Sequence, residues 1–150
     1  MKKKINVNSE KEMILLGERL GELVSPGMVF ALNGDLGAGK TTLVKGIGKG
    51  LNISEIINSP TFTILKIYYG RLTLYHLDVY RINEDSGDDY LEEYFYQDGV
   101  AVIEWAKNIN YLLPNDFLDI KINIISENVR EVTFNSESFL YINLIESVLI

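Results

Sequence analysis

Residues 34–41, GDLGAGKT, place three glycines, a lysine and a threonine within eight positions. The spacing Gly34-x-x-x-x-Gly39-Lys40-Thr41 is that of a phosphate-binding loop of the Walker A type. Glycines at these positions, with Gly37 between them, let the backbone bend so that several N–H groups point inward at one anion. Lys40 has the reach to neutralise outer phosphates, and the Thr41 hydroxyl suits a Mg²⁺ ligand. The segment therefore predicts a nucleotide site.

The residues on either side favour this interpretation. The run 28–32, MVFAL, is short and apolar and suits a strand buried on both faces. A helix is expected after the loop, because apolar residues follow at helical spacing: Leu43, Val44, Ile47 and Leu51. The positive end of its dipole would add to the attraction for phosphate. The alternative is an ordinary strand-to-helix turn with a surface lysine, and chance produces this spacing in roughly one chain in a hundred.

Two carboxylates are candidates for the chemistry beside such a loop. Glu104 directly follows the apolar run VAVI and is either a metal ligand at a strand end or a carboxylate facing solvent. Asp78 lies in YHLDVYR, where the period of two puts His76, Asp78 and Tyr80 on one strand face. A polar edge-strand face is the alternative there. His76 is the only histidine, so no site with two histidine ligands can form.

Two further features are weaker indications of a nucleotide site. The segment SPTF, made of Ser59, Pro60, Thr61 and Phe62, is either a strand start or a hydroxyl-bearing loop that contacts the γ-phosphate. Trp105 follows Glu104 and either packs over the nucleotide or fills the core. The core is the default expectation for a lone tryptophan.

Composition narrows the class of protein. The chain of 150 residues fits one domain with a substantial core. It contains no cysteine, which excludes disulfides and thiolate metal sites. No apolar run approaches the roughly 18 residues of a membrane helix, and no apolar segment follows the initial lysines as in a signal peptide, so we expect a cytoplasmic protein. The formal net charge of −7 argues against nucleic-acid binding by this chain alone.

The remaining patterns predict a mixed α/β sheet. Ser9 begins a Ser-x-x-Glu capping box before a helix whose apolar face carries Met13, Leu16, Leu20 and Leu23. Strands are expected at 5–7, on either side of a turn near Gly70, and at 100–103. The alternating run 118–124 is expected to pair with 130–134, and the C-terminal segment favours a helix.

Four segments in this order, GDLGAGKTT, SPTFT, HLDVYR and IEW, resemble the TsaE (formerly YjeE) ATPases of tRNA threonylcarbamoyladenosine biosynthesis. The resemblance covers nearly the whole chain. It implies a P-loop NTPase-like three-layer fold with a mixed central sheet and a C-terminal β-hairpin. It also implies ATP and Mg²⁺, and a role in forming threonylcarbamoyladenosine (t6A) at position 37 of tRNAs that read codons starting with A.

The partners implied by the resemblance are the proteins of the threonylcarbamoyl-transfer complex of the TsaB–TsaD type, with tRNA contacted only indirectly and no membrane involved. The resemblance also assigns roles by position. Asp78 and Glu104 are catalytic, Thr41 and Glu104 hold the metal, and Ser59, Pro60, Thr61 and Phe62 form a switch-like segment. The nucleotide-binding residues are Glu10, Leu36, Gly37, Ala38, Gly39, Lys40, Thr41, Thr42 and Arg130.

Two other functions compete with this one. A small-molecule P-loop kinase usually needs several lid arginines to exclude water, and the chain has only four arginines, which are scattered. A GTPase would be expected to carry an Asn-Lys-x-Asp motif, which the sequence lacks. A nucleotide-gated binding module in which hydrolysis is incidental stays open. For the ATPase, we expect weak hydrolysis without partners.

Overall fold

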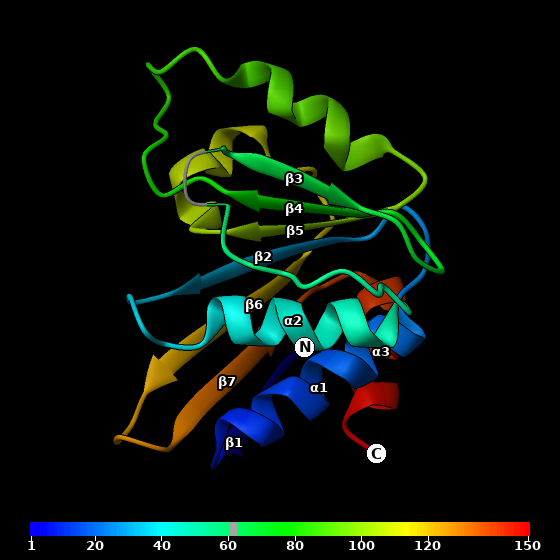
Figure 1. Cartoon of the computed structure of the whole chain (residues 1–150), viewed down its shortest axis with the longest axis vertical. Helices are drawn as coiled ribbons and strands as arrows, with labels where there is room; N and C mark the ends of the chain where they lie inside the picture. The colour runs from blue at the N-terminus through cyan, green and yellow to red at the C-terminus, as the bar shows by residue number, and fades with distance from the viewer. Residues whose placement is uncertain (61–62) are drawn as a thin grey trace.

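A computed structural model describes residues 1–60 and 63–150 of the chain. Within them, seven strands form one mixed sheet in the order β1-β7-β6-β2-β5-β4-β3 (Figure 1). The strands are β1 (Lys2–Val7), β2 (Val29–Gly34), β3 (Leu65–Tyr68), β4 (Leu74–Asp78), β5 (Val100–Glu104), β6 (Leu118–Ile124) and β7 (Arg130–Asn135). The helices are α1 (Glu10–Leu23), α2 (Lys40–Gly50) and α3 (Phe139–Val148), with the 3₁₀ segments η1 (Asp89–Tyr96) and η2 (Ala106–Leu112).

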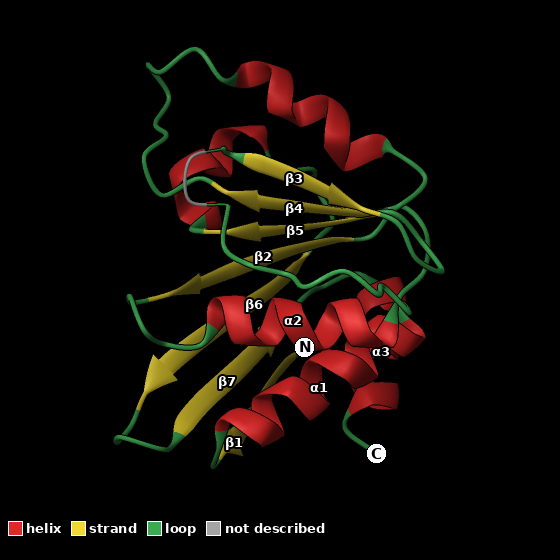
Figure 2. Ribbon diagram, viewed as in Figure 1, coloured by secondary structure: helices red, strands yellow, loops and turns green. Residues whose placement is uncertain are grey.

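The four central strands are parallel, and their direction decides where a site can form. β2 pairs in parallel with β5 and β6, and β5 pairs in parallel with β4. The arrows of β2, β4 and β5 consequently end at the same edge, where the loop to α2 also begins (Figure 2). Ligands of open parallel sheets bind outside the carboxyl ends of the strands. The expected mixed α/β sheet is thus confirmed.

Both faces of the central strands are buried, in line with the apolar runs at 28–32 and 100–103. In β2, Phe30 and Leu32 lie in the hydrophobic cluster that includes residues of α1, α2 and α3. Val29 and Ala31 alternate with them and lie in a second cluster with residues of η1 and η2. The sheet is therefore the middle layer of three, as the family resemblance implies.

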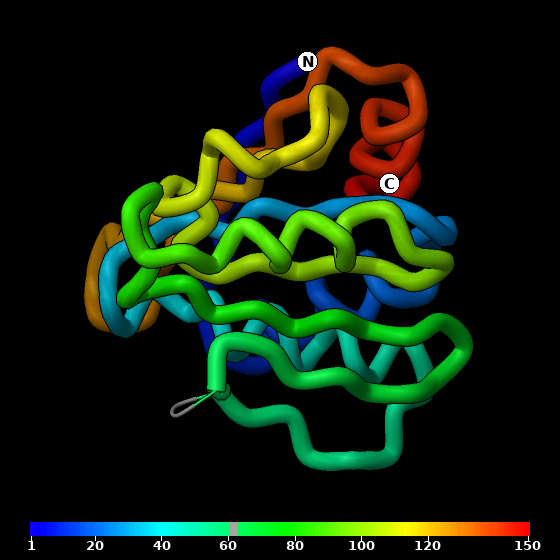
Figure 3. The backbone as a smooth tube through the Cα atoms, turned by 90° about the horizontal axis from the view of Figure 1, so that it is seen from above, coloured from blue at the N-terminus to red at the C-terminus, as the bar shows by residue number. Residues whose placement is uncertain are grey.

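The ends of the chain are tied to the edge strands. β7 pairs antiparallel with β6 as the expected hairpin, and β1 adds antiparallel to β7. The N-terminal ammonium donates to the carbonyl oxygen of Ser136, which directly follows β7, at 2.7 Å. Both chain ends lie in the upper part of the view in Figure 3. No helix in residues 1–60 or 63–150 combines the length and apolarity needed to cross a membrane.

The first helix begins with the capping residues that its sequence contains. Ser9 is the N-cap, and its side-chain oxygen accepts from the Glu12 N–H at 3.1 Å. The Glu12 carboxylate accepts from the backbone N–H of Asn8 at 2.7 Å, one residue before the usual partner in a capping box. The predicted apolar face needs a correction: Met13 and Leu20 are buried, whereas Leu23 is 37% exposed.

Glycine pairs set the distance between α1 and α2. Gly17 and Gly21 of α1 face Gly46 and Gly50 of α2. A Cβ atom on any of the four would lie 2.1–2.3 Å from a carbonyl oxygen of the facing helix. Because those contacts are with backbone, the helices would have to separate to accept a side chain. α2 begins at Lys40, so this contact also fixes the position of the phosphate-loop helix.

One local expectation differs from the structure. β4 ends at Asp78, so Tyr80 is not on the same strand face as His76 and Asp78. The period-two argument fails there because the strand stops before it reaches Tyr80.

We predict that Gly46→Ala lowers the free energy of unfolding by about 3 kcal/mol, because the new methyl group overpacks a backbone contact. Gly48→Ala is the matched control on the same helix. There the nearest atoms to the added Cβ all belong to side chains, Cδ1 and Cγ1 of Ile57 and Cδ1 of Ile53, and a side-chain end can shift where backbone cannot. We expect this control to lose about 1 kcal/mol or less, because alanine also favours the helix. Urea unfolding followed by circular dichroism measures both, and equal losses would contradict the role given to the close helix contact.

Candidate nucleotide site

The glycine loop lies between β2 and α2, and the structure gives a reason for each of its glycines. Gly37 and Gly39 have φ angles of 81° and 108°, a region that side chains disfavour. A Cβ on Gly34 would lie 2.6 Å from the carbonyl oxygen of Ile122 on β6. The crowding of glycine in this segment follows from these two backbone conformations and one close approach.

Lys40 is held inside the loop and is only 5% exposed. Its Nζ donates to the carbonyl oxygens of Gly34 at 2.5 Å and Asp35 at 3.0 Å, and lies 4.1 Å from the ring centroid of Trp105. Burial lowers the pKa of Lys40, and the nearby carboxylates of Glu104, Asp78 and Asp35 oppose that shift. The ammonium is thus partly desolvated, and an anion in the loop would restore its electrostatic stabilisation.

Glu104 lies at the centre of the site. It is 2% exposed, so the alternative of a strand-end carboxylate facing solvent is wrong. Thr41 Oγ1 lies 3.0 Å from Oε1 and 3.2 Å from Oε2 of Glu104, and the hydroxyl donates to the carboxylate. His76 Nε2 lies 2.6 Å from Oε2. The structure therefore brings together Thr41 and Glu104, the two residues predicted to hold a metal.

Asp78 is the direct neighbour of Glu104 in the register of β4 and β5. Its Oδ2 accepts from the Ser59 hydroxyl at 3.1 Å, and its Oδ1 accepts from the Tyr80 backbone N–H at 3.1 Å. Ser59 thus links the expected switch-like segment to the expected catalytic carboxylate. Pro60 of that segment is buried. Thr61 and Phe62, assigned to the same segment, lie outside the described residues.

A cavity of about 290 Å³ opens on one side of the loop. It gathers residues from the start of α1, the glycine loop and the β6–β7 turn, which are far apart in sequence. Six of the predicted nucleotide-binding residues line it: Glu10, Gly37, Ala38, Gly39, Thr42 and Arg130. Ser9, Met13, Glu127 and Asn128 complete the lining. The positional assignments of Glu10 and Arg130 therefore fall on one cavity beside the loop.

Arg130 is hydrogen-bonded to the backbone of the glycine loop. Its Nε donates to the carbonyl oxygen of Ala38 at 3.1 Å and its Nη2 to that of Gly37 at 3.3 Å. Its Nη1 donates to carbonyl oxygens in the β6–β7 turn, the shortest contact being 2.7 Å to Ser126. The side chain thus joins β7 and the turn to the loop that carries Lys40.

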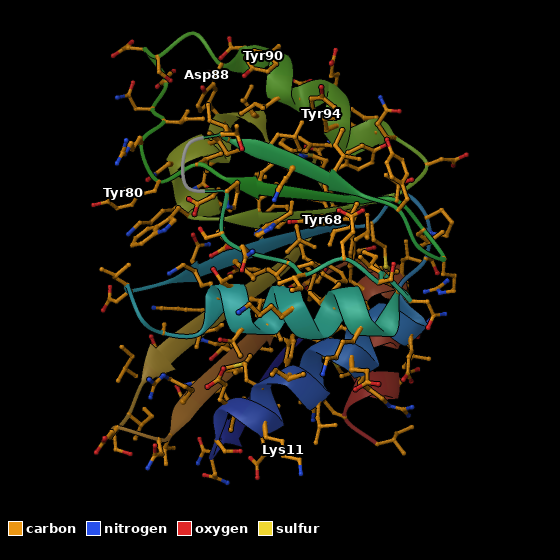
Figure 4. The ribbon with its side chains drawn as sticks, viewed as in Figure 1. Lys11, Tyr68, Tyr80, Asp88, Tyr90 and Tyr94 are labelled. Carbon is orange, nitrogen blue, oxygen red and sulfur yellow. The ribbon has the colours of Figure 1, made fainter. Side chains whose placement is uncertain are left out.

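A second cavity, of about 530 Å³, lies on the other side of the loop and includes Asp78 and the predicted nucleotide-binding residue Leu36, which is 87% exposed. Trp105 also lines this cavity, and its half-buried side chain packs against the second hydrophobic cluster, so the two interpretations of this residue are not exclusive. The positive φ of Trp105, 62°, turns the chain sharply after β5. The ring centroids of Trp105 and Tyr80 are 5.0 Å apart. Tyr80 projects outward beyond the carboxyl end of β4 (Figure 4).

The donor set suits a magnesium nucleotide. Mg²⁺ is usually held by one or two protein oxygens together with phosphates and water. Thr41 Oγ1 and the Glu104 carboxylate supply two such oxygens beside the loop. Within the described part of the chain no group of three or more His, Asp and Glu side chains is arranged to hold a metal ion, so an all-protein cage is not available there.

Sequence reasoning missed several of these features. It placed His76 on the strand face of Asp78 and excluded a two-histidine site, but gave no role to His76, Glu127 or Asn128. The clue for His76 was its place two residues before Asp78 on a strand parallel to β5. That register, which is a tertiary feature, was needed to see the contact with Glu104.

The fold and the site together define a P-loop protein: a mixed sheet, a glycine loop leading into α2, and a carboxylate at the neighbouring strand end. The family model described as Threonylcarbamoyl adenosine biosynthesis protein TsaE matches residues 7–132. The chain belongs to the TsaE family.

Individual relatives agree with this assignment. The tRNA threonylcarbamoyladenosine biosynthesis protein TsaE of Bacillus subtilis is 46% identical over 143 residues, which are 95% of this chain and 90% of that protein. The protein of the same name from Treponema pallidum is 46% identical over 119 residues, 78% of this chain and 88% of its own length. The crystal structure of Bacillus subtilis YdiB matches with a TM-score of 0.87 at 38% identity, over 99% of this chain and 95% of that one.

We predict that Arg130→Met loosens the glycine loop in the nucleotide-free protein. Methionine keeps an unbranched apolar stem but loses the hydrogen bonds, and a bond from a charged donor contributes about 1.5–3 kcal/mol. Amide hydrogen exchange of residues 35–39 should accelerate by about tenfold or more. Arg19→Met is the control, because Arg19 Nη2 bonds the carbonyl oxygen of Ser147, at 3.3 Å, on the side of α3 and away from the glycine loop. Unchanged exchange in Arg130→Met would show that the arginine does not brace the loop.

Proposed function

We propose that the protein is a Mg²⁺-dependent ATPase that supports formation of the threonylcarbamoyl group on adenosine 37 of tRNAs reading ANN codons. The observation that carries the proposal is the grouping of Lys40, Thr41 and Glu104 at the glycine loop. Membership of the TsaE family and the names of the relatives support the pathway.

The proposal gives each group one task. The glycine loop and the N-terminus of α2 bind the phosphates through backbone N–H groups, and Lys40 leaves the two carbonyl oxygens to neutralise them. Thr41 and Glu104 hold Mg²⁺, which supplies charge neutralisation at the phosphates. Asp78 orients the attacking water by accepting a hydrogen bond from it. The cavity beside Glu10 and Arg130 takes the nucleoside.

Weak hydrolysis by the isolated protein is part of the proposal. Phosphoryl transfer is accelerated by positioned positive charge, often an arginine supplied by a partner. Arg130 already donates to several carbonyl oxygens, and Arg81, which lines the cavity of Asp78, is exposed. We therefore propose that proteins of the TsaB–TsaD type complete the site, and that tRNA is reached only through them because the net charge is −7.

We predict that Lys40→Ala abolishes tight nucleotide binding, because the loop loses the ammonium that is buried beneath it. Lys45→Ala is the control, since Lys45 is exposed on the same helix. Titration with a fluorescent ATP analogue measures both affinities. If Lys40→Ala bound the analogue as tightly as the control, the loop would not be the phosphate site.

We predict that Asp78→Asn binds ATP nearly as wild type does but fails to hydrolyse it, because an amide is a weaker acceptor for the attacking water. The assay that decides function is multiple-turnover t6A formation by the purified partners, with wild type, Asp78→Asn or no protein added. Wild type should sustain turnover and Asp78→Asn should not. Asp85→Asn, a change at an exposed loop residue, is the matched control.

The same assay separates the alternatives. Equal turnover with wild type and Asp78→Asn would make hydrolysis incidental, as in a nucleotide-gated binding module. No effect of either protein, with accumulation of a phosphorylated small molecule, would support a kinase instead.

A further inference from the structure

His76 contacts Glu104 in a part of the structure that water does not reach. The histidine is 0% exposed, and its Nε2 lies 2.6 Å from Oε2 of Glu104. Its other ring nitrogen, Nδ1, is buried and has no hydrogen-bond partner among the described residues. A buried polar atom without a partner is costly, so an apolar side chain would suit the packing better. The histidine therefore needs an explanation beyond filling space.

The chemistry of the carboxylate decides what His76 does. An ionised carboxylate only accepts hydrogen bonds, so the ring nitrogen facing it must carry the proton. His76 Nε2–H thus donates to Oε2, and the Thr41 hydroxyl donates to the same carboxylate from α2. Glu104 is consequently held between a strand and a helix that are adjacent only in the folded chain.

We propose that His76 is a positioning residue for the metal ligand Glu104. By occupying Oε2, it fixes the rotation of the carboxylate and leaves Oε1, 3.0 Å from Thr41 Oγ1, directed at the loop. This inference rests on the proposed function, in which Glu104 and Thr41 hold Mg²⁺. Carboxylates that ligate metals are commonly oriented by a further hydrogen bond of this kind.

The sheet makes this arrangement rigid. His76 pairs with Val102 and Asp78 pairs with Glu104 in the parallel ladder of β4 and β5. The two side chains of β4 therefore lie on the face of the sheet that carries Glu104, toward α2. A ligand oriented from a central strand is held more closely than one oriented from a loop.

Two amide variants separate the hydrogen bond from the size and polarity of the side chain. In His76→Gln, an amide N–H reaches about as far from the backbone as Nε2 does and can replace the donor. In His76→Asn, the amide reaches only about as far as Nδ1, so the donor is lost while polarity is kept. His76→Leu removes both. Glu104→Gln serves as the reference for loss of the ligand itself.

The measurement is Mn²⁺ binding, by electron paramagnetic resonance, in the presence of a non-hydrolysable ATP analogue. We expect His76→Asn and His76→Leu to bind Mn²⁺ about 10–100-fold more weakly than wild type, the usual effect of losing such a supporting bond. His76→Gln should stay close to wild type. The affinity for the analogue in EDTA should be the same in all four His76 proteins, because the phosphate loop is intact.

Different outcomes identify different failures. If Glu104→Gln binds Mn²⁺ as well as wild type does, the proposed metal site is wrong. If Glu104→Gln weakens Mn²⁺ binding but His76→Asn does not, only the role of His76 is wrong. A loss of analogue affinity in EDTA, or failure of His76→Asn to fold, would also overturn the inference, since the residue would then serve stability. Should His76→Leu alone fail to fold, the comparison of His76→Asn with His76→Gln decides.

Discussion

A carboxylate buried at the end of a central strand is the constraint on which the rest of the site depends. Glu104 is 2% exposed, and a charge removed from water is strongly destabilising unless other groups compensate it. Hydrogen bonds from Thr41 and His76, together with the nearby Lys40 ammonium, supply that compensation. Lys40 and Thr41 are the first residues of α2, and His76 lies in β4. Compensation of the charge at the end of β5 thus requires α2, β4 and β5 to be in place together.

The architecture brings those parts to one point through backbone contacts. The parallel register of β4 and β5 sets Asp78 beside Glu104. The facing glycines of α1 and α2 let the helices approach closely, and the first turn of α2 contacts the end of β5 through Thr41 and Glu104. Arg130 then joins the loop to the β6–β7 turn. A small chain can therefore form a phosphate site whose position is set by the sheet and not by the loop alone.

The features that the sequence predicted are those encoded locally. The glycine loop, the Ser9 cap, the strand before Glu104 and the β6–β7 hairpin each follow from spacing within a short segment. What could not be predicted depends on neighbours distant in sequence. Burial of Glu104 decided between two open alternatives, and the contact of Lys40 with Trp105 showed that the tryptophan borders the site as well as the core. The bonds of Arg130 to loop carbonyls required the turn to be placed beside the loop, which no local pattern encodes.

The most direct test of the account is a crystal structure with a non-hydrolysable ATP analogue and Mg²⁺. The account predicts that Lys40 Nζ leaves the carbonyl oxygens of Gly34 and Asp35 for the β- and γ-phosphates. It also predicts that Mg²⁺ lies between Thr41 Oγ1 and the Glu104 carboxylate, with His76 still bonded to Oε2. An analogue bound away from the glycine loop, or a metal ion without Glu104 in its surroundings, would contradict it.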